Sequence, residues 1–180
     1  MTRFPLRSLR LLPGEEHTAR VEVELEPLDL GGQAYSLSPH VVETELAVQR
    51  ATSGLVFRLR FAVDVHGPCM RCLDDAVAHL PVDVLEYHDA EAGGDEELRS
   101  DYVADDQLAL SAWARDSVAL ALPDPILCRP DCAGLCPACG KNLNVEPHIH
   151  EEAATDPRWA ALDALAREVR DDGYSPPPSS

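Results

Sequence analysis

Alternating apolar and polar residues dominate the first half of the chain. Residues 19–26 (ARVEVELE) and 55–65 (LVFRLRFAVDV) change character at nearly every position, which is typical of strands that bury one face. Residues 76–87 (AVAHLPVDVLEY) repeat the pattern, and Pro81 favours an edge strand or a bulge. Residues 41–48 (VVETELAV) fit either a strand or a helix. Because these runs follow one another through short connections, they predict an antiparallel sheet rather than βαβ units.

Two helices are predicted in the second half, each from small or apolar residues spaced three and four apart. The first covers residues 110–121, and Pro123 and Pro125 must end it. The second covers 156–171, where Asp156 can cap the helix and Pro157 fits its first turn. The stripes consist of Leu110, Trp113, Ala114, Ser117, Val118 and Ala121 in the first helix and of Trp159, Leu162, Leu165, Ala166 and Val169 in the second.

The chain of 180 residues is long enough for one domain with its own core, which we place at residues 1–172. Residues 89–101 (DAEAGGDEELRSD) interrupt all periodicity, and they fit either a solvated surface loop or an acidic docking element. Gly173 ends the second predicted helix, and residues 173–180 have the composition of a disordered tail.

The net charge of the chain limits the kinds of molecule that it is expected to bind. The 15 basic and 32 acidic residues give a net charge of −17 and a pI near 4.6, which argues against DNA binding and against broad, non-specific RNA binding. One local basic run, formed by Arg3, Arg7 and Arg10, fits a solvated end segment or a contact with RNA or a partner. We find neither a membrane-length apolar stretch nor a secretory signal, so the expected location is the cytoplasm without membrane attachment.

Six cysteines carry the candidate chemistry. In a reducing compartment they indicate metal or redox chemistry rather than disulfides. Two histidines lie close to the last cysteine pair, and together these residues give eight candidate zinc ligands: Cys69, Cys72, Cys128, Cys132, Cys136, Cys139, His148 and His150.

The spacing of these eight residues divides them into two sets of four. The segment 128–150 contains a zinc knuckle, Cys136-x2-Cys139 followed by a glycine, and its two histidines complete one set. Cys128 and Cys132 are left needing two partners, which the distant C-x-x-C pair at 69–72 can supply. Closed four-ligand sites are structural, so we expect two structural zinc ions. His148 and His150 also fit exposed loop residues, and the C-x-x-C pair alone also fits a redox pair.

The sequence resembles the bacterial YceD family. The resemblance rests on CMRCL at 69–73, LALP at 120–123, CRPDCAGLCPACGKNLN at 128–144 and DPRWAAL at 156–162, and it spans roughly residues 10–170. It implies an α+β fold, an antiparallel sheet with a few helices that the Cys/His clusters staple together. The knuckle matches a longer subgroup in which a C-x-C often follows, where this chain has His148 and His150.

The resemblance also implies a role in the accumulation of large-subunit ribosomal RNA. We therefore expect a non-enzymatic ribosome-assembly factor whose partner is a ribosomal protein or an assembly intermediate of the large subunit. Two alternatives stay open. One is a zinc-dependent RNA hydrolase, for which the sequence offers no open metal position or catalytic acid. The other is a zinc-thiolate redox switch at Cys69 and Cys72.

Overall fold

The computed structural model describes residues 1–91 and 96–150, so the predicted helix at 156–171 and the tail at 173–180 lie outside the described residues. The chain forms two compact units, Met1–Glu146 and Pro147–Ser180. The regular elements among the described residues all belong to the first unit: β1 (Phe4–Pro5), β2 (Glu16–Glu24), β3 (Leu28–Leu30), β4 (Gln33–Ser38), β5 (Val41–Arg50), β6 (Leu55–Pro68), β7 (Asp75–His88), the 3-10 helix η1 (Glu96–Leu98), β8 (Val103–Ala104), β9 (Gln107–Leu108) and α1 (Leu110–Ala121).

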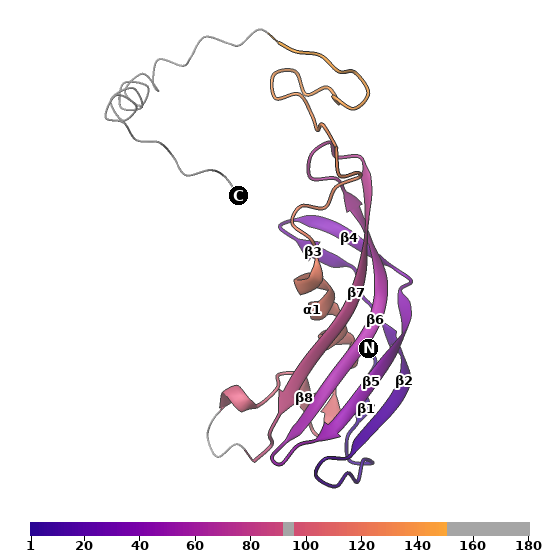
Figure 1. Cartoon of the computed structure of the whole chain (residues 1–180), viewed down its shortest axis with the longest axis vertical. Coiled ribbons are helices and arrows are strands. Elements are labelled where there is room, and N and C mark those ends of the chain that lie inside the picture. Colours follow the sequence, from indigo (N-terminus) through magenta and orange to yellow (C-terminus); the bar gives the residue numbers. More distant parts are fainter. Residues whose placement is uncertain (92–95, 151–180) are drawn as a thin grey trace, which may run out of the picture. The chain divides into compact units, whose positions relative to one another are not determined.

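Strand β6 is the centre of a six-stranded antiparallel sheet (Figure 1). Strand β7 pairs with β6 over its whole length, from Leu55 opposite His88 to Pro68 opposite Asp75. On the other side of β6, β5 pairs with its first half and β4 with its second half, and β2 and β3 extend the sheet outward. These pairings confirm the antiparallel sheet and the three predicted strands, and they show that segment 41–48, which fitted either a strand or a helix, is a strand. Pro81 lies in β7, whose only described partner is β6, as predicted for an edge strand.

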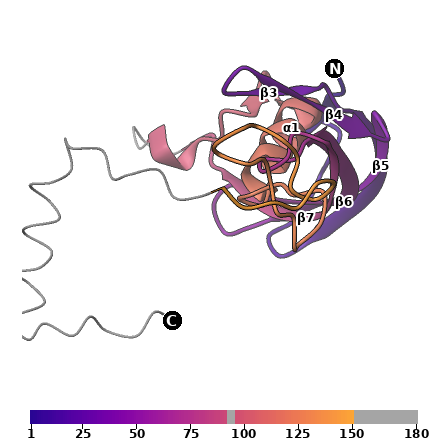
Figure 2. The ribbon, with the colours of Figure 1, turned by 90° about the horizontal axis from the view of Figure 1, so that it is seen from above.

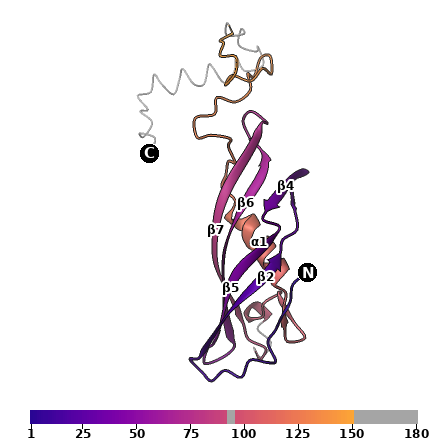
Figure 3. The ribbon, with the colours of Figure 1, turned by 90° about the vertical axis from the view of Figure 1, so that its right-hand side faces the viewer.

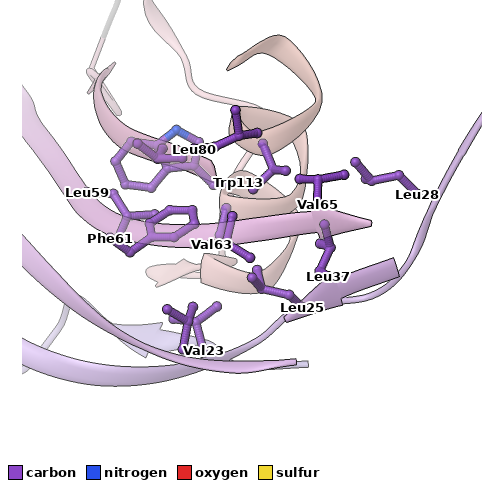
Figure 4. Packing of buried hydrophobic residues seen from close by; sticks show 14 of the residues in the cluster. Val23, Leu25, Leu28, Leu37, Leu59, Phe61, Val63, Val65, Leu80 and Trp113 are labelled. Carbon is purple, nitrogen blue, oxygen red and sulfur yellow. The ribbon is translucent and has the colours of Figure 1, made fainter. Parts of the chain in front are cut away.

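The core lies between the sheet and α1, which the strands surround when seen from above (Figure 2) and from the side (Figure 3). Every second residue of β6 is buried on this face, namely Phe57, Leu59, Phe61, Val63 and Val65. Trp113 of α1 belongs to the same cluster as Leu59, Phe61 and Val63 (Figure 4). Its ring meets that of Phe57 edge-on at a centroid distance of 6.4 Å. The predicted helix at 110–121 is therefore confirmed, with its apolar stripe against the sheet.

The α+β fold class expected from the resemblance is wrong for the described residues. They form mostly antiparallel sheet, and α1 is the only α-helix among them. Residues 28–38 add a hairpin, β3–β4, that the alternation did not predict, and segment 122–146 is irregular apart from one bridge between Leu135 and Asn142. Among the described residues an α-helix therefore forms in one segment only. The other connections between strands are too short, or too rich in glycine and proline, to form a helix.

The ends of the acidic segment 89–101 are tied to the fold, while residues 92–95 lie outside the described part. The amide of Asp89 donates to the carbonyl of Leu98 at 2.8 Å, and Ser100 is buried.

A small second sheet, β1-β9-β8, joins the N-terminal segment to residues 103–108, where Arg7 pairs with Asp106 at 2.6 Å. No helix in the described ranges combines the length and apolarity required to cross a bilayer.

Burial on the two faces of the sheet gives a matched test. Leu46 of β5 is fully buried, whereas Leu85 of β7 is 66% exposed on the outer face. We expect Leu46→Ala to lower the free energy of unfolding by about 2–5 kcal/mol, because it leaves a cavity in the core. Leu85→Ala should change it by less than about 0.5 kcal/mol. Urea unfolding of both variants measures the difference, and equal effects would contradict this placement of the core.

Candidate metal centre

Four cysteines from distant parts of the sequence meet at the end of the β6–β7 hairpin. Cys69 and Cys72 lie in the turn that joins the strands, and Cys128 and Cys132 lie in the segment that follows α1 (Figure 1). The Sγ atoms are 3.7 Å apart for Cys69 and Cys132 and 3.6 Å apart for Cys72 and Cys128. All four sulfur atoms lie within 4.8 Å of one another. The structure therefore brings together, as a four-thiol cluster, the cysteines that the sequence places in one set.

The four-thiol cluster has the dimensions of a tetrahedral metal site. Metal–sulfur bonds of about 2.3 Å place the ligands of a tetrahedral zinc ion about 3.8 Å apart. The separations of 3.7 and 3.6 Å are close to this value. Three of the cysteines are buried, and Cys128 lies at the surface. Four protein thiolates occupy every position of a tetrahedron, which is the arrangement of a structural site and suits zinc or iron.

The turn between β6 and β7 holds its two cysteines through backbone hydrogen bonds. The amide of Leu73 donates to the carbonyl of Cys69 at 3.0 Å, and the amide of Cys69 donates to the carbonyl of Asp74 at 2.7 Å. The amide of Arg71 points at the Sγ atom of Cys69 at 3.5 Å. The C-x-x-C spacing thus closes a tight turn in which backbone dipoles face a thiolate.

The segment after α1 is fastened to this turn at several points. The amide of Met70 donates to the carbonyl of Ile126 at 2.9 Å, and the amide of Leu135 donates to the carbonyl of Arg71 at 2.9 Å. The guanidinium group of Arg71 also donates to the carbonyl of Cys132 at 3.0 Å. Gly134 has a φ of +78°, and a Cβ atom there would lie 3.1 Å from the carbonyl oxygen of Arg71. Glycine therefore permits both the backbone conformation and the close approach of the two segments.

Asn144 supports the four-thiol cluster from outside its ligands. Its side-chain amide donates to the Sγ atom of Cys132 at 3.3 Å, and its Oδ1 atom accepts from the amide of Ala133 at 2.8 Å. Asn142 orients Asn144 and donates to the carboxylate of Asp74 at 2.7 Å. Such outer contacts orient the ligands and raise metal affinity.

The surroundings favour the thiolate form at two of the four cysteines. Burial is the largest single influence on Cys69 and raises its pKa, but donation from surrounding backbone amides outweighs it and lowers the pKa to about 6. Donation from Asn144 is the main cause that lowers the pKa of Cys132. Burial raises the pKa of Cys72 and of Cys128. Because a bound metal requires thiolates, the cluster offers two prepared ligands and two that the charge of the metal would have to deprotonate.

The second predicted set of ligands is divided between the two compact units. Cys136 and Cys139 belong to the first unit, where the amide of Gly140 donates to the carbonyl of Cys136 at 2.8 Å, as in a knuckle. His148 and His150 belong to the second unit, with perpendicular rings whose centroids are 4.9 Å apart. Each pair is compatible with metal binding, and their joint site stays a prediction from the sequence.

The turns at Cys69–Leu73 and Cys136–Gly140 have the same design. In each, the residue after the second cysteine donates its amide to the carbonyl of the first, at 3.0 Å for Leu73 and 2.8 Å for Gly140. Both residues have a positive φ, +66° for Leu73 and +72° for Gly140. This conformation costs a residue with a Cβ atom roughly 1–2 kcal/mol, and glycine avoids that cost. Leu73 is thus a strained residue at a position where the chain elsewhere uses glycine.

Sequence reasoning identified the cysteines but missed the residues that position them: Arg71, Gly134, Asn142 and Asn144. The asparagines were visible only as part of the motif GKNLN, because an amide side chain has no spacing rule that links it to a sulfur atom far along the chain. A glycine that precedes a cysteine pair is likewise common in turns, and its contact with Arg71 depends on the fold.

The contact between Asn144 and Cys132 generates a prediction. Asn144→Ala should weaken zinc binding by about 10- to 100-fold, because it removes a donor to a ligand sulfur and loosens the segment that carries Cys132. The affinity would be measured by competition with a chromophoric chelator, in a Cys139→Ser background so that the knuckle does not contribute. Lys141→Ala, a change at an exposed neighbour, is the control. Equal affinities of the two variants would contradict a supporting role for Asn144.

The chain is similar to known proteins over most of its length. Residues 57–166 match the family model described as "Large ribosomal RNA subunit accumulation protein YceD". The chain is 34% identical over 149 residues to uncharacterised proteins of Mycobacterium tuberculosis and Mycobacterium bovis, a region that covers 80% of this chain and 67% of each relative. An uncharacterised Mycobacterium leprae protein is 30% identical over 157 residues, or 84% of this chain and 68% of its own. No solved structure matches the chain. The extent of the family match and these identities show that the chain belongs to the YceD family.

Proposed function

We propose that this protein is a non-enzymatic cytoplasmic factor that supports the accumulation and processing of large-subunit ribosomal RNA during ribosome assembly. A structural zinc ion in the four-thiol cluster stabilises it. A second zinc ion is held by Cys136, Cys139, His148 and His150, where the two histidines stand in place of the C-x-C that often follows the knuckle in the subgroup that this chain resembles. The observation that carries the proposal is the family match, and the family is named for the accumulation of this RNA.

The geometry of the four-thiol cluster supports a structural rather than a catalytic metal. Cysteine sulfur atoms account for all four positions of a tetrahedron, so no position is left for a water molecule or a substrate. The amide of Asn144 donates to the Sγ atom of Cys132 at 3.3 Å, and this side chain is neither an acid nor a base. These features disfavour the alternative of an RNA hydrolase at this cluster.

The charge of the chain favours a basic protein as its partner. The net charge is −17, and the main cations on the outer face of the sheet are neutralised locally. Arg58 forms two hydrogen bonds of 2.7 Å with Asp83, and Arg60 pairs with Glu45 at 2.9 Å. Ribosomal proteins are a basic class, and complementary charge would steer such an encounter. Direct contact with RNA is confined to local sites in this proposal.

Removal of the metal should loosen the first unit. Cys72 and Cys128 are 56 residues apart, and a cross-link over such a loop stabilises by about 4 kcal/mol through chain entropy. For a chain of this size the thermal midpoint should fall by about 10 °C after chelation or in Cys72→Ser. The amides of Met70 and Leu135, which fasten the two segments, should exchange faster with solvent.

Cys139→Ser is the matched control for Cys72→Ser, since it leaves the four-thiol cluster intact. We expect its zinc content to fall from two ions to one, whereas its thermal midpoint should fall less than that of Cys72→Ser. An unchanged midpoint and unchanged hydrogen exchange after metal removal would contradict a stabilising metal.

Depletion of the protein in its own host tests the cellular role. We expect a lower ratio of large- to small-subunit ribosomal RNA and a sedimentation profile with precursor particles in place of mature large subunits. The wild-type gene and Leu85→Ala should restore the ratio, and a double Cys72→Ser, Cys128→Ser variant should not. A ratio that stays normal on depletion would refute the proposed function.

A further inference from the structure

Leu73 occupies a position in its turn where a leucine is unfavourable for folding. Its φ of +66° matches that of Gly140 in the equivalent turn, and a side chain would have open space around Gly140. Steric crowding therefore does not exclude a side chain at this position of such a turn. Glycine is favoured there only because the backbone φ is positive. The side chain of Leu73 strains the turn without being required to close it.

Burial does not compensate for this strain in the part of the chain that the structure describes. Leu73 is 65% exposed, and Met70 in the same turn is 58% exposed. Strained residues that the surrounding structure holds in place are concentrated at binding and switch sites. Two exposed apolar side chains on one tight turn thus form a candidate contact surface, which we name the Met70–Leu73 tip.

The Met70–Leu73 tip is held rigidly. Its backbone is fixed by the hydrogen bonds from Leu73 to Cys69 and from Met70 to Ile126, and its two cysteines belong to the four-thiol cluster. A rigid apolar group loses little conformational freedom when a partner covers it, which is the property of an anchor in an interface.

Charges near the tip indicate what kind of molecule covers it. Asp74 and Asp75 follow Leu73 in the chain, and Asp124 precedes the Ile126 contact; Asp75 and Asp124 form no ion pair within the described ranges. The neighbouring cations have partners within the fold: Arg71 donates to the carbonyl of Cys132, and Arg129 donates to Asn144 and pairs with Asp131. An acidic surrounding disfavours RNA and favours a basic protein.

The chain's own C-terminal segment is a poor occupant by the same criterion. Residues 151–172 contain seven acidic and three basic residues, so their net charge is −4, the same sign as the charge around the tip. A separate, basic molecule is the better match.

We propose that the Met70–Leu73 tip is a docking site for a basic ribosomal protein, with Leu73 as its apolar anchor and the neighbouring aspartates as contacts for Lys or Arg side chains. The choice of ribosomal proteins as the source rests on the proposed function. The docking surface itself rests on the strain at Leu73, the exposure of both side chains and the local charge.

Leu73→Gly separates binding from folding. The full-length, zinc-loaded variant should keep its zinc content and have a thermal midpoint at or above that of the wild type, because glycine relaxes the turn. Each protein would be immobilised and mixed, separately, with the proteins and with the RNA extracted from the large ribosomal subunits of the host. Retained proteins would be identified by mass spectrometry and retained RNA by sequencing. We expect the wild type to retain a defined basic protein and Leu73→Gly to bind it at least about tenfold more weakly.

Leu85→Ala is the matched control, because Leu85 is exposed to the same degree on the outer face of the sheet. It should bind as the wild type does, which distinguishes anchoring by Leu73 from general attraction between acidic and basic proteins. Leu73→Asn, a polar residue tolerated at positive φ, should lose binding as Leu73→Gly does and provides a second variant if glycine alters the turn.

Three results would overturn the inference: equal binding by the wild type and both Leu73 variants, a wild type that selects ribosomal RNA in place of a protein, or a wild type that binds no extracted protein until its residues 151–180 are removed. Failure of the proposed function is separate, because it would appear as a normal ribosomal RNA ratio after depletion of the whole protein. If depletion lowers the ratio but Leu73→Gly restores it fully and binds normally, only the docking site is wrong.

Discussion

The antiparallel pairing of β6 with β7 is the constraint on which the rest of the structure depends. Its fourteen residue pairs fix which face of each strand is buried, because a slip of one residue would turn every side chain to the opposite face. The inner face of β6 carries the core against α1, and the end of the ladder presents Cys69 and Cys72. Since α1 packs on this sheet, the segment that follows it reaches the same end of the hairpin with Cys128 and Cys132. The register therefore determines the position of the four-thiol cluster.

Local pattern was sufficient to predict the elements that are long and buried on one face. The strands β2, β6 and β7 and the helix α1 all lie close to their predicted ranges, because alternation and helical spacing record which side faces the core. The segment that forms β5 fitted either a strand or a helix. The hairpin β3–β4 was missed because its short strands are defined by pairing with β6 and with each other rather than by their own pattern. The expected α+β class failed for a related reason: the resemblance implied several helices, and the described residues supply one.

At the candidate site, too, features set by local sequence could be predicted, whereas contacts between distant segments could not. Cysteine spacing was enough to group Cys69 and Cys72 with Cys128 and Cys132, because a tetrahedral ion needs four ligands and the knuckle already has its own candidates. The hydrogen bonds that complete the site could not be predicted. They join Asn144 to Cys132 and Arg71 to residues 132 and 135, and each depends on how two separate segments cross. Strain at Leu73 was also invisible, since CMRCL shows a leucine but not its φ.

A metal in the four-thiol cluster would order a segment that the hydrophobic core cannot order by itself. Segment 122–146 contains no helix or strand of its own apart from the Leu135–Asn142 bridge, and Ile126, Cys132 and Cys136 are its only buried apolar residues. So small an apolar area cannot order a segment of this length, and small structures of this kind are usually stapled by metals or disulfides. A metal bound there would also hold the turn that carries Met70 and Leu73, because Cys69 and Cys72 belong to that turn. Metal binding and presentation of the exposed apolar tip would then be coupled, with the sheet as the frame and the four cysteines fixing its end.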